Sequence, residues 1–172
     1  NCYDEGVDFM FGDALFVANV VEKGAKARRV YLPEGEVFYD FYTRERYDGG
    51  QTIEFPVDLG SIPLFVRSGA IVPMALNKMN NLMTQKATGL NILCAPDVRA
   101  GEQTVFSFRN AGDYKTTVED IYLDVIHREK APYWVKADGH DLPHFLHRKK
   151  FEAAEEGWYY SQRLKSVQIK YK

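Results

Sequence analysis

The sequence predicts an all-β protein made of two consecutive antiparallel β-sandwich modules, with few or no long helices. Tyr and Phe occur 11 times each and supply most of a 14% aromatic content, and aromatic residues favour the pleated, half-buried surface of a sheet. Short apolar or alternating runs follow one another with turn residues between them, which is typical of sandwiches and barrels. The first 75 residues contain no sustained apolar repeat at i, i+3, i+4 and i+7, which an amphipathic helix would show.

Four runs predict the first strands, and turn residues separate them. The runs are residues 14–21, 28–32, 37–43 and 52–57. Gly24 ends the first run, Pro33 and Gly35 end the second, and the Asp48-Gly49-Gly50 turn precedes the fourth.

The most hydrophobic stretch, IPLFVRSGAIVPM at residues 62–74, places two apolar runs around Arg67-Ser68-Gly69. A transmembrane helix needs about 20 apolar residues and would not carry Arg at its centre. We therefore expect two strand segments, with Gly69 allowing a bend and Arg67 either reaching solvent or pairing with a carboxylate.

The second half resumes the strand pattern after a polar segment at residues 76–89, which we expect to connect the two modules. Further strands are predicted at residues 90–95, 104–108, 120–127 and 132–136, and a closing hairpin at residues 157–160 and 166–171. Asp138-Gly139 is a strong turn signal. The basic cluster at residues 147–150 is predicted to be a solvated loop, since acidic residues follow it.

Charge and cysteine content exclude several classes of function. With 24 acidic and 22 basic residues the formal net charge is −2, which gives no electrostatic reason to expect nucleic acid or an anionic membrane as partner. Cys2 and Cys94 are too few and too far apart for a disulfide framework or a zinc knuckle, so we expect two free thiols. The sequence shows no signal-peptide pattern and begins at Asn1 rather than Met, so we expect a processed chain or a piece of a longer one.

Motifs for catalysis or cofactor binding are missing from the sequence. No Ser lies in a Gly-x-Ser-x-Gly elbow, and there is no phosphate-binding loop or His-Glu-x-x-His zinc motif. His140 and His144 have Pro143 between them, which favours an extended loop over a helical metal-binding pair. Carboxylates are plentiful, yet spacing singles out no glycosidase pair. We therefore expect no metal, no cofactor and no catalytic residue in this chain.

A series of motifs between residues 8 and 74 nevertheless resembles glycoside hydrolase family 31, the family of α-glucosidases and α-xylosidases. The motifs are Asp8-Phe9-Met10-Phe11-Gly12, residues 14–20, Gly24, Val30-Tyr31-Leu32-Pro33, Gly35, residues 39–43, Tyr47-Asp48-Gly49-Gly50 and residues 62–73. Residues 90–92, 131–139, 157–160 and 167–170 resemble the distal part of the family's C-terminal region more weakly.

The resemblance implies a domain order. Residues 1–12 would be the tail of a preceding catalytic (β/α)8 barrel, residues 13–76 the proximal C-terminal β domain, residues 77–89 a connection, and residues 90–172 the distal β-sandwich. The chain departs from the family pattern at two positions and one segment: Asn19 replaces a Pro, Arg44 replaces a Gly, and residues 108–112 replace an acidic turn.

The resemblance also implies that catalysis lies elsewhere. Family members are similar in using a retaining mechanism with two aspartates, and retaining sites hold their carboxyl groups about 5 Å apart. Those aspartates belong to barrel segments upstream of the Phe-Met-Phe-Gly motif. We therefore expect a chain that is inactive alone and that packs on the barrel of a parent α-glycosidase and stabilises it.

Two sets of candidate residues follow. Phe9, Phe11 and Phe16 are expected to pack on the barrel and to leave an apolar patch in its absence. An alternative is a carbohydrate-binding module, in which oligosaccharide stacks on exposed aromatic rings. The candidates for that role are Tyr133, Trp134, Trp158 and Tyr159, although a β-sandwich also needs large aromatic residues in its core.

Overall fold

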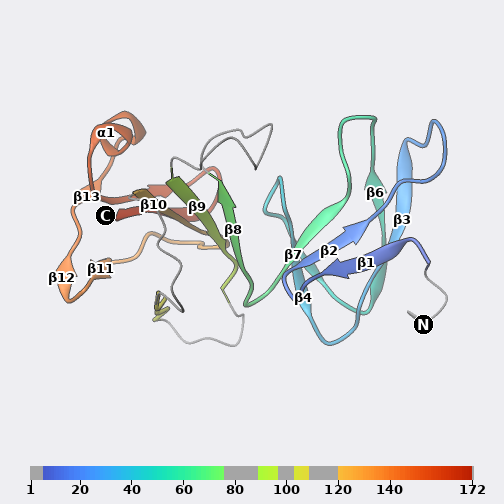
Figure 1. The fold of residues 1–172 in the computed structure, drawn as a ribbon, viewed down its shortest axis with the longest axis horizontal. Helices are drawn as coiled ribbons and strands as arrows, with labels where there is room; N and C mark the ends of the chain where they lie inside the picture. The colour runs from blue at the N-terminus through green and yellow to red at the C-terminus, as the bar shows by residue number, and fades with distance from the viewer. Residues whose placement is uncertain (1–5, 76–88, 97–102, 109–119, 172) are drawn as a thin grey trace, which may run out of the picture. The chain divides into compact units, whose positions relative to one another are not determined.

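The computed structural model describes residues 6–75, 89–96, 103–108 and 120–171. The chain divides into two compact units, Asn1–Ala70 with Ala95–Val98 and Ile71–Cys94 with Arg99–Lys172. Strands dominate both units (Figure 1), and α1 (Arg148–Ala153) is the one helix in the described residues. The predicted all-β class with antiparallel sheets is confirmed. In the described residues no helix has the length and apolar character needed to cross a membrane.

The first unit consists of a five-stranded and a two-stranded antiparallel sheet. The larger sheet has the spatial order β1 (Asp8–Phe11), β2 (Leu15–Ala18), β7 (Leu64–Arg67), β4 (Val37–Asp40) and β5 (Arg46–Asp48). The smaller sheet pairs β3 (Ala27–Leu32) with β6 (Gln51–Pro56). Side chains from both sheets form one hydrophobic core, which contains Phe16, Ala18, Val30, Leu32, Phe38 and Phe65.

Strand β4 ends at Asp40, three residues before the end of the predicted run. The buried Asp40 carboxylate accepts hydrogen bonds from the backbone N–H groups of Tyr42, at 2.6 Å, and Thr43, at 2.7 Å. This side-chain turn competes with strand pairing for the same N–H groups. The chain therefore turns away from the sheet immediately after Asp40.

The stretch at residues 62–74 forms two strands, but they belong to different sheets. Strand β7 lies between β2 and β4 in the first unit, whereas β8 (Ile71–Ala75) pairs with β9 (Gly89–Cys94) in the second. Gly69 has φ 83°, a value that glycine adopts at little cost. Arg67 lies 3.4 Å from the Glu36 carboxylate, in agreement with the expected carboxylate partner. The Arg67-Ser68-Gly69 tripeptide thus marks the passage of the chain from one unit to the next.

The second unit is built on a six-stranded mixed sheet. Its spatial order is β13 (His144–Phe145), β14 (Gly157–Ser161), β15 (Ser166–Tyr171), β10 (Asp120–Val125), β9 and β8. The expected closing hairpin is present as the antiparallel pair β14–β15. Two pairs, β9–β10 and β13–β14, are parallel. The core on one face contains Ile92, Cys94, Leu123, Val125, Leu142, Trp158 and Val167.

Two predicted strands of the second unit differ in the structure. Residues 104–108 form no strand, and the run at residues 132–136 contributes only to β11 (Lys136–Ala137). Strand β11 pairs with β12 (His140–Asp141) across Asp138-Gly139. Both turn residues have positive φ, 46° and 86°, which matches the turn that two-residue hairpins favour.

The basic cluster forms the first turn of helix α1 rather than a loop. Arg148 and Glu152 form an i,i+4 ion pair at 2.7 Å, and Phe151 is buried. The Lys170 ammonium donates hydrogen bonds to the carbonyl oxygens of Glu152, at 2.6 Å, and Ala154, at 3.1 Å. These contacts stabilise a helix too short to be stable alone. The expected connection at residues 77–89, except Gly89 at the start of β9, and most of the turn at residues 108–112 lie outside the described residues.

Candidate functional site

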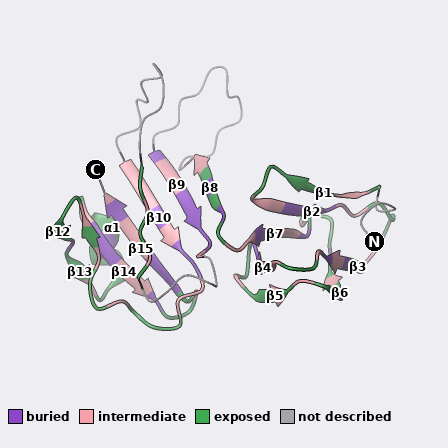
Figure 2. Cartoon of the chain, turned by 90° about the horizontal axis from the view of Figure 1, so that it is seen from below, coloured by how far each residue is buried: buried purple, intermediate pink, exposed green. Residues whose placement is uncertain are grey.

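The edge strand β1 is the most exposed apolar strand of the first unit (Figure 2). Phe9 is 46% exposed and Phe11 is 68% exposed. Phe16, the third expected barrel-packing residue, is only 5% exposed because its ring packs against Phe38 and Phe65 in the core. The ring of Phe16 is therefore not available to a partner, while Phe9 and Phe11 are.

Strand pairing places apolar residues of β2 and β7 on the same face of the sheet as Phe9 and Phe11. Phe9 lies opposite Val17 and Phe11 lies opposite Leu15. Val17 in turn lies opposite Leu64. Residues directly opposite in an antiparallel pair share a face of the sheet, so these five apolar side chains project from the same side. We call them the β1–β2–β7 face; Leu15, Val17 and Leu64 are half-buried within it.

Contacts on the opposite side of β1 and β2 fix this orientation. Asp8 forms an ion pair with Arg28 of β3, and both side chains are largely buried. Phe16 and Ala18 project into the core from the same side as Asp8. Because these residues face inward, the alternation of a strand directs Phe9, Phe11, Leu15 and Val17 outward.

The sequence alone did not identify Leu15, Val17 and Leu64 as members of this face. Their membership depends on which strands pair and in which register, and a shift of one residue would exchange the two faces. A usable signal was the alternation within residues 15–18, where Phe16 and Ala18 alternate with Leu15 and Val17.

The four aromatic candidates for carbohydrate binding occupy different environments. Tyr133 is 102% exposed and Trp134 is 53% exposed, with the Lys136 ammonium 5.6 Å from the Trp134 ring. Trp158 is 2% exposed and stacks on His144 at 3.8 Å between ring centroids, so its ring belongs to the core. Tyr159 is half-buried and stacks on Phe151 at 6.0 Å.

Titratable groups with perturbed pKa values do not form a reactive cluster in the described residues. Burial, with a smaller contribution from Asp124, raises the pKa of the Cys94 thiol to about 12. Burial and a hydrogen bond to Glu45 raise the pKa of Tyr47 to about 12. Both shifts favour the neutral form, which makes Cys94 a poor nucleophile. In the part of the chain that the structure describes, no group of three or more His, Cys, Asp or Glu residues is placed to hold a metal ion.

Known proteins that are similar to this chain are glycosidases and related carbohydrate-active enzymes. Residues 1–72 match the model of the glycosyl hydrolase family 31 C-terminal domain, so this part of the chain is similar to that domain. The resemblance drawn from the motifs between residues 8 and 74 is confirmed.

Individual relatives cover different parts of the chain. An α-xylosidase from Saccharolobus solfataricus is 41% identical over 81 residues, which are 47% of this chain and 11% of the xylosidase. Neutral α-glucosidase C from Macaca fascicularis is 30% identical over 152 residues, 87% of this chain and 16% of that protein. This chain thus spans less than a fifth of the length of either relative.

A solved structure is similar to nearly the whole chain. The cycloalternan-forming enzyme from Listeria monocytogenes, in complex with a pentasaccharide substrate, superimposes with a TM-score of 0.74. The sequences are 26% identical, and the match covers 95% of this chain and 17% of the enzyme. The similarity in fold therefore extends beyond residue 72 into the second unit.

Proposed function

We propose that this chain is the non-catalytic C-terminal region of a retaining α-glycosidase. Its first unit, which includes β1, is the proximal β domain and its second unit is the distal one, and a catalytic (β/α)8 barrel precedes them in the parent chain. The parent supplies the two catalytic aspartates from that barrel. The family 31 match at residues 1–72 supports this assignment.

The observation that carries the proposal is the exposed β1–β2–β7 face. It lies within the segment that matches the family domain, and its Phe9 and Phe11 side chains are exposed to water while its other apolar side chains are half-buried. Contiguous exposed apolar surface of this kind marks interaction sites. The face packs against the barrel, where full burial of a Phe side chain stabilises by about 1.5–3 kcal/mol. The role of the chain is therefore to complete and stabilise the enzyme's fold.

Self-association of the isolated chain tests whether the β1–β2–β7 face binds other apolar surfaces. We expect the isolated chain to form dimers or larger species as its concentration rises in light scattering, because copies cover the face for one another. A Phe9→Ser/Phe11→Ser variant should remain monomeric. Tyr133→Ser, which removes an exposed aromatic residue outside the face, should behave like the wild type. Equal association of all three proteins would contradict the assignment.

A hydrolysis assay tests the absence of catalysis. We expect the purified chain to release no nitrophenol from nitrophenyl α-glucoside or nitrophenyl α-xyloside. Turnover proportional to the concentration of the chain would overturn the proposed non-catalytic role.

The exposure of Tyr133 and Trp134 favours a second candidate function, carbohydrate binding by the second unit. Sugars present apolar faces to aromatic rings, and Trp134 offers a half-exposed one. Titration with maltose, xylose-containing oligosaccharides and dextran fragments, followed by tryptophan fluorescence, tests this function. A saturable change that Trp134→Phe abolishes would support it, and a flat response to every sugar would exclude it.

A further inference from the structure

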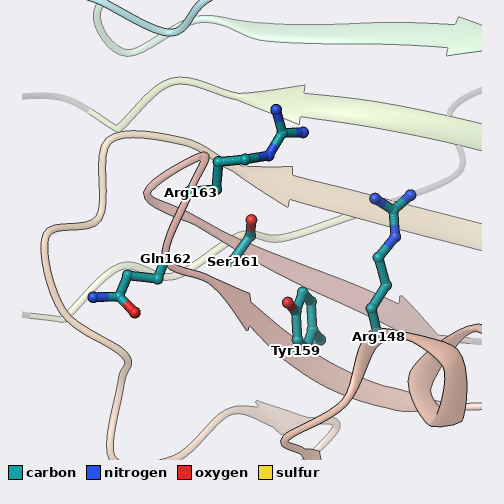
Figure 3. Close-up of a pocket in the computed structure, with 5 residues that line it drawn as sticks. All are labelled: Arg148, Tyr159, Ser161, Gln162 and Arg163. Carbon is teal, nitrogen blue, oxygen red and sulfur yellow. The ribbon is translucent and has the colours of Figure 1, made fainter.

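Two hollows with polar linings, of about 310 Å³ and about 570 Å³, lie on the face of the six-stranded sheet that is opposite its hydrophobic core. Because Arg148 lines both, we describe them together as the groove. Figure 3 shows the larger hollow, where the Arg148 and Arg163 guanidinium groups extend above Tyr159 and Ser161 while the Gln162 amide points away from them. The smaller hollow is lined mainly by Asn91, Tyr122, Asp124, Glu152, Gln168 and Lys170.

The strand register places the groove side chains in rows. Gln168 of β15 lies opposite Tyr159 of β14 and also opposite Asp124 of β10. In the adjacent row Tyr122 lies opposite Lys170 and beside Asn91 of β9. Neighbouring strands are about 4.8 Å apart, so each row runs for about 10 Å or more. The groove is therefore long enough for a ligand larger than one small ring.

Helix α1 forms one wall of the groove, and a buried lysine holds it there. Lys170 is 6% exposed, and its hydrogen bonds to the carbonyl oxygens of Glu152 and Ala154 tie the helix to β15. Its ammonium also lies 5.2 Å from the Tyr122 ring. These contacts position Arg148 and Glu152 along the groove before any ligand arrives, which lowers the entropic cost of binding.

The groove carries charges of both signs. Arg148, Arg163 and Lys170 contribute positive charge, whereas Asp124 and Glu152 contribute negative charge. Two of the three cations already have partners, because Arg148 Nε lies 2.7 Å from the Glu152 carboxylate and the buried Lys170 ammonium donates to backbone carbonyl oxygens. A simple anion would face two carboxylates, and a simple cation would face two guanidinium groups. A neutral ligand with hydroxyl groups suits the lining better, since hydroxyls both donate to carboxylates and accept from guanidinium and amide N–H groups.

We propose that this groove binds a neutral oligosaccharide. The Tyr159 and Tyr122 rings contact its apolar faces, as aromatic side chains do in mixed polar and apolar sites. Gln168 and Arg148 bind its hydroxyl groups. This site is separate from the Tyr133–Trp134 pair, which lines neither hollow. Only the choice of α-linked sugars as probes rests on the proposed glycosidase parent.

The experiment is an NMR titration of the ¹⁵N-labelled full chain with maltotriose and isomaltotriose, with cellotriose as a β-linked probe and inorganic phosphate as an anionic one. We expect saturable shifts of the amide signals of Tyr122, Tyr159 and Gln168 with at least one trisaccharide, at a Kd of about 1 mM, the weak end of the usual range. Gln168→Ala should weaken binding at least fivefold. Because Gln168 is half-buried, the exposed Arg163→Ala provides a second test that does not perturb the sheet.

Arg29→Ala is the matched control, since Arg29 is exposed on β3 of the first unit and lies outside the groove. It should bind with the affinity of the wild type. The proposal is overturned by the absence of saturation with all three sugars, by saturation with phosphate alone, by shifts centred on Trp134, or by unchanged affinity in both groove variants. None of these outcomes alters the light-scattering or hydrolysis tests, so failure here is distinguishable from failure of the proposed non-catalytic role.

Discussion

Residue identity alone does not decide whether a side chain is buried in this protein. Phe9, Phe11 and Phe16 lie within eight residues of one another, yet only Phe16 is in the core. Similarly, Trp158 is buried while Trp134 is half-exposed. The sequence predicts that such aromatic residues belong to strands, but the face each one occupies depends on the pairing register, which involves strands distant in the sequence. The sequence therefore identifies candidate residues, but it does not show which of them are exposed and which are buried.

Substitution of Asp40 tests how much one buried carboxylate contributes to the stability of the first unit. Asp40→Ala removes the acceptor for the Tyr42 and Thr43 N–H groups, and leaving such donors unsatisfied costs about 1–3 kcal/mol. We expect a loss of that size in the free energy of unfolding of the first unit. Both Trp residues, Trp134 and Trp158, belong to the second unit, so the transition should be followed by NMR signals of β4.

The exposed Asp48 serves as the control for Asp40. Its ion pair with Arg46 is at the surface, and surface pairs contribute about 0–1 kcal/mol. Asp48→Ala should therefore leave the unfolding transition nearly unchanged. An equal loss of stability in both variants would show that the Asp40 turn has no special role.

Cys94 should be inert in the folded chain. Burial raises the pKa of its thiol to about 12, so at pH 8 almost no thiolate forms. In a Cys2→Ser variant we expect a disulfide reagent to label Cys94 only after urea unfolds the second unit. Rapid labelling of the native protein would contradict the buried position.

The raised thiol pKa also predicts a dependence of stability on pH. The folded state favours the neutral thiol, so its contribution is complete below about pH 9 and is lost as pH rises from about 9 towards 12. Urea unfolding of the Cys2→Ser variant should show a loss of stability in this window that a Cys2→Ser/Cys94→Ala variant lacks.

At the scale of elements, the turn at residues 48–51 is fixed by the chain before β4. Gly49 N–H donates a hydrogen bond to the Glu36 carbonyl and Gly50 N–H donates one to the Leu32 carbonyl, both at 2.8 Å. A Cβ atom at Gly49 would lie 2.0 Å from the Pro33 carbonyl oxygen. The two backbone segments are therefore in direct contact, and only glycine fits between them.

Gly49→Ala should destabilise the first unit by about 1–3 kcal/mol, the usual range for overpacking, or by more, because the clash is with backbone atoms. The measurement is again urea unfolding followed by NMR signals of β4. Gly6→Ala is the control, since a Cβ there meets nothing within 4 Å. A Gly49→Ala protein as stable as Gly6→Ala would contradict the packing of this turn.

The sequence predicted most strands but not all of their partners. Turn residues and alternation located β3, β6, β10 and the closing hairpin, because these signals are local. The pairing of β8 with β9 was not predictable, since nothing in residues 70–74 indicates which sheet will accept the strand. Helix α1 was missed for a similar reason: its six residues are too few for a helical repeat, and it depends on Phe151 and Lys170 contacts with distant strands.

At the scale of the whole molecule, the two units differ in the surfaces they offer. The first unit presents the apolar β1–β2–β7 face, and the second presents a polar groove on the side of its sheet away from the core. An apolar face is suited to permanent packing within a folded protein, whereas a polar groove is suited to reversible binding. This division agrees with a region that packs on a catalytic domain through one unit and contacts carbohydrate through the other.

The most direct test of the central claim measures the exposure of Phe9 and Phe11 in the complete protein. Hydroxyl-radical footprinting would compare the isolated chain with the product of the full reading frame that encodes it, with the fully exposed Tyr133 as an internal reference. If the β1–β2–β7 face packs on a catalytic barrel, oxidation of Phe9 and Phe11 should fall at least fivefold relative to Tyr133 in the complete protein. Equal oxidation of both residues in the two proteins would contradict the proposed packing.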